Sequence, residues 1–329
     1  MVAYSVNNST GEPAFDCILP DSVADLPIVK GLFICLYSAV GVFSFLGNTA
    51  VLWIMIGKTE LQTVTNVFIA NLALSDLITT LSSLWISPLR IFMKGNWVLG
   101  HFMCHAKECA SALSTLISTY TLTAISIDRY MLILHPFQKG FSRRIFCGIT
   151  IAMTWTLAVA LSMPHVFHVH YWKLPCENVY FCTEMKWESE SLRVVYGMMI
   201  FLMKTLFPFT LIAFCCVRIQ RKLDCLHKRL VGRKLSCRTE CDDLQRKRHV
   251  QRILTAMIII FVACSTPLDV LNLVQDVDLT SNEPQLNLSV QFLVFLVTHF
   301  IAMTATLWNP LLYAWMNENF KREIQYRVR

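Results

Sequence analysis

Among the charged residues within long apolar stretches of the sequence, four could do chemistry: Asp76, Arg129, Lys204 and Asp269. A charge in the hydrocarbon of a membrane costs about 3 kcal/mol or more unless it meets a partner, water or a ligand, so each one marks a candidate site. Arg129 stands between Asp128 and Tyr130, where an apolar stretch ends. This setting favours a switch that faces a cytoplasmic partner over an arginine that only reaches back to the lipid headgroups.

Lys204 and Asp269 form the clearest candidate pair. Lys204 lies four residues before Pro208, and Asp269 lies two residues after Pro267. On neighbouring membrane helices these positions should face one another near the floor of a pocket. Because pairing offsets much of the desolvation cost of a buried charge, we predict a Lys204–Asp269 ion pair. Separate contacts of the two side chains with ligand or water are the alternative.

Asp76 is expected to face the interior of a helix bundle, where a carboxylate finds partners or a cation. Asn48, Ser118 and Asn309 are the polar side chains that we place around it. Pairing for packing alone is the alternative. A sodium ion near Asp76 is the only cofactor that the sequence suggests, and no metal site is predicted.

Seven apolar stretches must position these residues, at 29–56, 65–92, 102–134, 144–168, 193–218, 250–275 and 288–314. Each is long enough to cross a hydrocarbon core of about 30 Å as a helix. The chain is 55% hydrophobic and only 16% charged, whereas soluble domains are about 25% charged. The sequence therefore predicts an all-α membrane protein, a seven-transmembrane helix bundle.

The distribution of Lys and Arg predicts the orientation. Of 29 such residues, 20 lie in 57–64, 135–144, 218–252 and 317–329, which alternate with the acidic segments 1–28, 169–192 and 276–287. Since Lys and Arg gather on the cytoplasmic side, we expect the N-terminus outside and the C-terminus inside. The net charge of +7 then belongs to the inner face and does not indicate a nucleic-acid partner.

This topology divides the chain into three parts: an extracellular N-terminal segment (1–28), a transmembrane domain (29–316) that includes a cytoplasmic loop three (218–250), and a cytoplasmic tail (317–329). We expect no cleaved signal peptide in the first segment, which carries glycosylation sequons at Asn7 and Asn8. Four outer cysteines permit two disulfides. Cys104 is well placed to pair with Cys182, and Cys17 with Cys176 is a second pairing.

Several motifs occur in span order: Asn48, Asp76, Asp128-Arg129-Tyr130, Trp155, Pro208, Phe261-x2-Cys264-x2-Pro267 and Asn309-Pro310-x2-Tyr313. In this order they resemble the rhodopsin-like (class A) G-protein-coupled receptors over residues 29–328. The resemblance implies a plasma-membrane receptor whose Arg129 is freed on activation to meet a heterotrimeric G protein. It assigns coupling to the Asp128-Arg129-Tyr130 triplet together with Phe261, Pro267, Asn309, Pro310 and Tyr313. It also implies a short amphipathic surface helix at the C-terminus.

Three further runs are similar to the neuropeptide Y and neuropeptide F receptors: Thr63-Val64-Thr65-Asn66, Trp97-Val98-Leu99-Gly100 and His299-x2-Ala302-Met303. This similarity implies an extracellular neuropeptide ligand, and it gives Asp276 the role of binding an arginine of an amidated peptide. The outer segments carry eleven acidic residues against four lysines, a field that attracts a cationic ligand. Solubility is the plainer reason for acidic loops. The expected ligand-binding residues are Asp276, Asn272, Gln275, His299, Ser111, Glu184, Lys204 and Asp269.

Other functions fit the sequence less well. It contains no His-Glu-x-x-His, no Gly-x-Ser-x-Gly and no Gly-rich phosphate loop, so we do not expect an enzyme. Ser265 and Cys216 stand where the family usually has tryptophan and tyrosine. This departure leaves a non-signalling decoy or scaffold receptor as the alternative.

Overall fold

The computed structural model of the chain describes residues 26–57, 63–93, 96–135, 143–173, 179–184, 187–232, 238–278 and 288–316. Its helices are α1 (Pro27–Gly57), α2 (Val64–Thr79), α3 (Ile86–Phe92), α4 (Gly100–Leu134), α5 (Arg143–His168), α6 (Glu190–Phe201), α7 (Phe207–Gly232), α8 (Arg238–Asp278) and α9 (Leu288–Met316). Two short π-helices, η3 (Thr80–Leu84) and η4 (Leu202–Leu206), join α2 to α3 and α6 to α7. With these joined, the described chain holds seven helices long and apolar enough to cross a membrane, which confirms the seven predicted spans.

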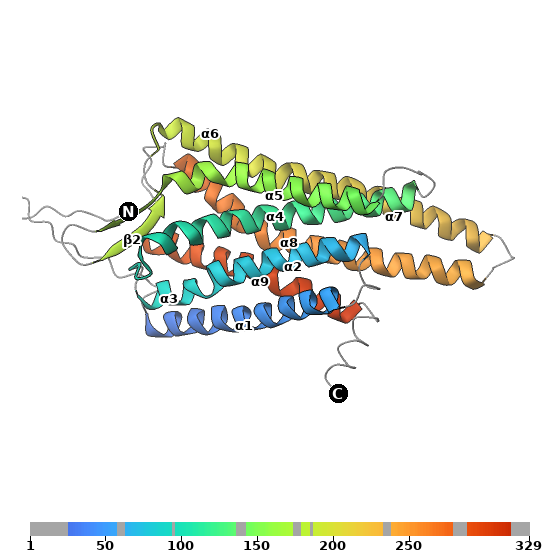
Figure 1. The fold of residues 1–329 in the computed structure, drawn as a ribbon, viewed down its shortest axis with the longest axis horizontal. Helices are drawn as coiled ribbons and strands as arrows, with labels where there is room; N and C mark the ends of the chain where they lie inside the picture. Colours follow the sequence, from blue (N-terminus) through green and yellow to red (C-terminus); the bar gives the residue numbers. More distant parts are fainter. Residues whose placement is uncertain are drawn as a thin grey trace, which may run out of the picture.

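The helices lie side by side along the long axis of the molecule (Figure 1). The strands β1 (Val169–Lys173) and β2 (Tyr180–Glu184) form an antiparallel hairpin at one end, with Val169 opposite Glu184. We call this the hairpin end and the opposite end the basic end. α7 and α8 extend beyond the other helices at the basic end (Figure 1). Exposed basic side chains cover this extension: Arg221, Lys222, Lys228, Arg229, Arg246, Lys247 and Arg252.

Much of the predicted cytoplasmic loop three, 218–250, is helical. α7 runs on to Gly232, and α8 already begins at Arg238. The apolar signal ends near the membrane boundary, but a helix needs no apolar surface on all sides once it leaves the bilayer. Leu223 and Leu244 are buried, and they pack with Ile219 in a cluster between the two extensions. This apolar stripe stabilises the two helical extensions within the segment predicted as loop three.

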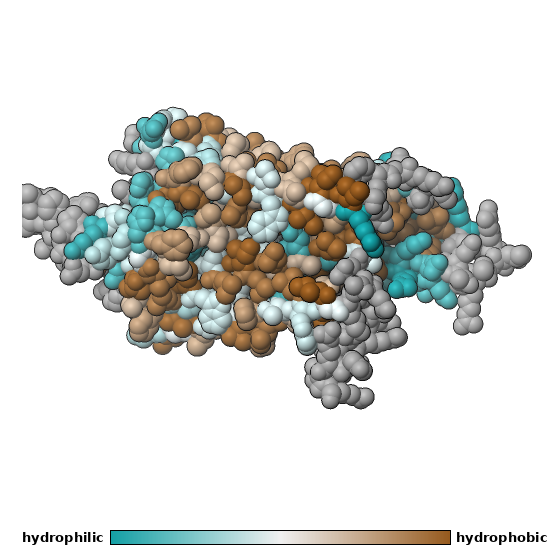
Figure 2. Space-filling model, in the orientation of Figure 1, coloured by the Kyte–Doolittle hydropathy of each residue, from teal (hydrophilic) through white to brown (hydrophobic). Residues whose placement is uncertain are grey.

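The flank of the bundle is apolar, as lipid contact requires. Figure 2 shows apolar residues over much of the middle of this face and hydrophilic residues gathered toward the two ends. Large apolar side chains point outward along it, such as Phe43 (63% exposed) and Trp53 (60% exposed). Exposing this apolar surface to water would be unfavourable, whereas contact with lipid chains carries no such cost.

Inside the bundle, polar side chains join α2 and η3 to α4 in four steps. Hydrogen bonds link the pairs Asn71–Thr121 (2.7 Å), Ser75–Ser118 (2.5 Å), Thr79–Ser114 (2.8 Å) and Ser83–Ser111 (3.3 Å). The steps are one helical turn apart and run in opposite directions on the two antiparallel helices. Small hydroxyl-bearing residues let the helix backbones approach closely and hydrogen-bond across the interface. This ladder fixes α4 in the bundle centre.

α1 and α9 make a close contact where Gly47 meets Pro310. A Cβ atom on Gly47 would lie 2.8 Å from Pro310 Cγ, so no side chain fits without moving one helix. We expect Gly47→Ala to destabilise the protein by about 1–3 kcal/mol, the usual cost of overpacking. The measurement is the melting temperature of the purified protein. Gly148→Ala is the matched control, because a Cβ there meets no atom within 4 Å; equal shifts in both variants would rule out the clash.

Candidate functional site

The β1–β2 hairpin is held against α4 by the disulfide Cys104–Cys182, which confirms the predicted pairing. Both cysteines are buried in a cluster with Trp97 and Val169. The backbone N–H of Trp97 donates to the carbonyl of Tyr180 at 2.8 Å, and its indole N–H donates to Gly100. These contacts fix β2, and therefore Glu184 at its end, over the bundle.

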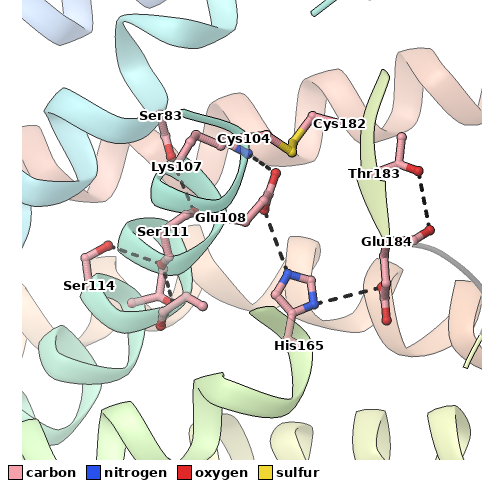
Figure 3. A network of polar contacts seen from close by, with 12 residues as sticks. Ser83, Cys104, Lys107, Glu108, Ser111, Ser114, His165, Cys182, Thr183 and Glu184 are labelled. Carbon is pink, nitrogen blue, oxygen red and sulfur yellow. Dashed lines mark hydrogen bonds and ion pairs between the residues drawn. A yellow bond between two sulfur atoms is a disulfide. The ribbon is translucent and has the colours of Figure 1, made fainter. Parts of the chain in front are cut away.

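A chain of polar contacts runs from α4 to the hairpin. Lys107 and Glu108 are neighbours on α4 and form an ion pair of 2.7 Å. His165, near the end of α5, lies 3.8 Å from a Glu108 oxygen and 3.9 Å from a Glu184 oxygen. Figure 3 shows the imidazole between the two carboxylates, close to the disulfide. The histidine thus connects two acidic side chains from different elements.

The chain continues through Arg193 on α6. Its Nη2 donates to Glu184 at 3.3 Å, and its Nε donates to Asp276 on α8 at 3.1 Å. The three side chains are 20–25% exposed, so they are shielded from solvent but not sealed from it. Glu184 also accepts a hydrogen bond from the indole of Trp187. We call Lys107, Glu108, His165, Glu184, Arg193 and Asp276 the hairpin-end network.

Asp276 lies against α6 because Gly197 leaves room for it. Gly197 follows Arg193 by one helical turn, and a Cβ at that position would collide with the Asp276 carboxylate. The resemblance implies that Asp276 binds an arginine of the ligand, and the structure places Arg193 of this chain on it. Arg193 stands at the first residue of an apolar span, so its sequence position does not indicate this pairing.

The other predicted ligand residues on α8, α9 and α4 have partners outside the hairpin-end network or lie beside Asp276. Asn272 is exposed and lies one turn before Asp276 on the same face of α8, with Gln275 beside it and partly buried. His299 instead hydrogen-bonds the hydroxyl of Tyr37 on α1 at 2.8 Å. His299 lies on α9, which packs against α8, and its hydrogen-bond partner is Tyr37 rather than Asp276. Ser111 accepts a hydrogen bond from Ser83.

Lys204 and Asp269 form the ion pair that the sequence predicts. Lys204 Nζ lies 2.6 Å from Asp269 Oδ1, and Thr205 donates to the other carboxylate oxygen at 2.8 Å. Lys204 lies in η4, the π-helical turn that precedes Pro208. A π-turn shifts the register of the side chains that follow, and such turns are frequent at functional sites. Asp269 is 7% exposed, so the pair is nearly enclosed.

Asp76 lies in a buried polar centre, as expected. Its Oδ2 accepts a hydrogen bond from Asn309 at 2.8 Å. Ser118 bonds Ser75, the residue next to Asp76 in the chain. Asn48 differs from the prediction, since its amide donates to the carbonyl of Thr306 and to Ser44. Asn48 Oδ1 is buried and has no hydrogen-bond partner within the described part of the chain.

The Asp128-Arg129-Tyr130 triplet ends near the basic end of α4. Asp128 is buried and accepts a hydrogen bond from Thr65 at 3.1 Å. Tyr130 packs against the apolar cluster between α7 and α8. The neighbouring helices are joined there by an ion pair of 2.8 Å between Arg248 and Asp224. Phe261 and Pro267 lie within α8, and Phe261 is buried in the main core cluster.

Some predictions fall outside the described residues: glycosylation at Asn7 and Asn8, the disulfide Cys17–Cys176, the Tyr313 side chain and the surface helix in 317–329. Within the residues that the structure does describe, no three His, Cys, Asp or Glu side chains come together as a metal site requires.

Comparison with known proteins identifies relatives over most of the chain. Residues 47–313 match the family model described as "7 transmembrane receptor (rhodopsin family)". The chain is 30% identical to the neuropeptide receptor npr-1 of Caenorhabditis elegans, over 88% of this chain and 71% of that protein. It is 31% identical to the mouse neuropeptide Y receptor type 2, over 89% and 75% of the two chains. It is 29% identical to the Drosophila melanogaster RYamide receptor, over 97% and 68%.

Proposed function

Since the chain belongs to the rhodopsin family of seven-transmembrane receptors, we propose that it is a cell-surface receptor for a basic, C-terminally amidated neuropeptide of the neuropeptide F/Y type. Binding at the hairpin end is transmitted to a heterotrimeric G protein at the basic end. A receptor function follows from the family, and the relatives are likewise receptors rather than enzymes. The relatives give no support to the decoy alternative.

One observation carries the choice of ligand: the hairpin-end network holds a guanidinium between two carboxylates. Glu184 and Asp276 both bond Arg193, which is direct support for their fit to an arginine side chain. Arginine matches paired carboxylates better than lysine does, because its planar fork offers several donors in fixed directions. Asn272 extends this surface by one helical turn and offers an amide to the peptide.

The distribution of charge supports the orientation. Basic side chains gather on the extensions of α7 and α8, and Lys and Arg favour the cytoplasmic side of a membrane. The hairpin end, with the disulfide, then faces the outside of the cell, where disulfides persist. Arg129 and the α7–α8 extensions face the G protein. Pro267 and Pro310 interrupt the hydrogen bonding of α8 and α9, which supports a movable inner half.

The surroundings of Asp76 fit a sodium ion. A hard cation prefers oxygen ligands, and the Asp76 carboxylate and the Ser118 hydroxyl are the oxygens that would hold it. A bound cation would neutralise a carboxylate that lies in the middle of the membrane.

The ligand class is tested by binding of paired synthetic peptides to membranes that carry the receptor. One peptide of each pair ends in Arg-Phe-amide or Arg-Tyr-amide, and its partner replaces that arginine with citrulline, which has the same shape but no charge. We expect binding of the arginine peptides and a loss of at least tenfold in affinity with citrulline, as for loss of a charged hydrogen-bond partner. Equal affinity within each pair would remove the basis of the ligand assignment.

A further inference from the structure

We propose that Arg193 is a built-in competitor of the ligand: its guanidinium occupies the two carboxylates, Glu184 and Asp276, that the arginine of the peptide must take. This inference rests on the proposed function. Arg193 then determines which ligands bind. A ligand side chain can displace it only if that side chain binds both carboxylates at least as well.

The contacts of Arg193 are those of a bound ligand. Nε and Nη2 lie on one edge of the guanidinium, and they reach carboxylates from two different elements, β2 and α8. Neither carboxylate needs Arg193 to be built into the fold: Glu184 is held by the disulfide-anchored hairpin, and Asp276 by its helix. The arginine therefore acts as an occupant of a site that other elements form.

Gly197 is an independent sign that α6 is shaped to receive Asp276. The bare Cα of this glycine leaves a recess one turn below Arg193, and the Asp276 carboxylate fills it. A glycine inside a helix lowers helix stability by up to about 1 kcal/mol relative to alanine. At Gly197 this cost is explained by the close contact with Asp276. The recess lets the Asp276 carboxylate lie against α6, within reach of Arg193.

Displacement of Arg193 has a consequence for the helices. The Arg193–Asp276 ion pair joins α6 to α8 at the hairpin end. A ligand arginine that binds Asp276 would break the Arg193–Asp276 ion pair. Glu184 would still have His165 as a neighbour, at 3.9 Å. Two guanidinium groups cannot share the site without repulsion, so the ligand must replace the internal pair rather than add to it. The receptor therefore binds the peptide more weakly than it would if Arg193 did not occupy the two carboxylates.

The test is the affinity of an Arg-Phe-amide peptide for the variant Arg193→Gln, measured on whole receptor in membranes and normalised to surface expression. We expect affinity to rise about tenfold, because the peptide no longer displaces a charged partner. The rise should disappear in Arg193→Gln combined with Asp276→Asn. Lys173→Gln removes an exposed positive charge of the hairpin and is the matched control for long-range attraction; we expect a change of less than threefold there.

A second variant covers the case in which Arg193→Gln does not reach the cell surface. Gly197→Ala fills the recess and pushes Asp276 away from α6, so it should also raise the affinity while Arg193 remains. Unchanged or reduced peptide affinity in either variant would overturn the proposal, because Arg193 would then be a positioning residue for Asp276. Failure of the proposed function looks different: neither the wild type nor any of these variants would bind the amidated peptides.

Discussion

Asp269→Asn is expected to remove most of the receptor from the cell surface. The substitution leaves the ammonium of Lys204, which is 17% exposed, inside the membrane without its counter-ion. Breaking a buried pair by removing one partner costs about 3–5 kcal/mol. A folded domain has only about 5–15 kcal/mol of stability in total, so much of it would be lost. Surface staining of intact cells and the melting temperature of the solubilised receptor measure the effect.

The double variant Lys204→Met with Asp269→Asn is the decisive comparison. Replacing both charges removes the desolvation cost as well as the attraction, and such replacements are often neutral or stabilising. Asparagine also keeps an oxygen that can accept the hydrogen bond of Thr205. We therefore expect the double variant to recover most of the surface expression. Glu188→Gln, which changes an exposed carboxylate, is the matched control. If the double variant is no better than Asp269→Asn alone, the pair does not explain the loss.

Asp276→Asn is expected to lower the affinity for an Arg-Phe-amide peptide about 30-fold. Truncating one partner of a buried, hydrogen-bonded charge pair costs 2–5 kcal/mol or more, and partial exposure of Asp276 places the effect toward the lower end of that range. The measurement is competition binding at a fixed salt concentration, since screening weakens exposed pairs.

Two comparisons make this result specific. The citrulline peptide should bind the wild type and Asp276→Asn with similar affinity, because it brings no charge for the carboxylate. Glu190→Gln removes an exposed carboxylate from α6 and should change the affinity less than threefold. Equal binding of the arginine peptide to Asp276→Asn and wild type would separate Asp276 from ligand recognition.

The architecture could be predicted because membrane insertion constrains the sequence strongly. Each span is predominantly apolar, and the predicted and observed boundaries agree within a few residues at most helix ends. The Lys204–Asp269 pair was predictable for the same reason, since a charge inside an apolar stretch has few partners to choose from. Pro208 and Pro267 indicate where Lys204 and Asp269 lie along their helices.

Most of the hairpin-end network could not be predicted. Charged residues near helix ends are common, and the direction in which their side chains point depends on the rotation of each helix. Glu108 and His165 belong to α4 and α5 and gave no motif, yet the structure brings both to Glu184. Arg193 is the first residue of an apolar span, a position where a charged side chain is common. The length of the helical extensions at the basic end could not be predicted, because a helix outside the membrane lacks a continuous apolar signal. These features depend on tertiary packing rather than on local sequence.

The most direct test of the whole account is nucleotide exchange on heterotrimeric G proteins by the purified receptor in a lipid bilayer. We expect an Arg-Phe-amide peptide to accelerate exchange for at least one G-protein family, and the citrulline peptide to have little effect. Arg129→Ala should keep peptide binding but abolish the acceleration. Peptide binding without exchange on any G-protein family, or full activity in Arg129→Ala, would contradict the account.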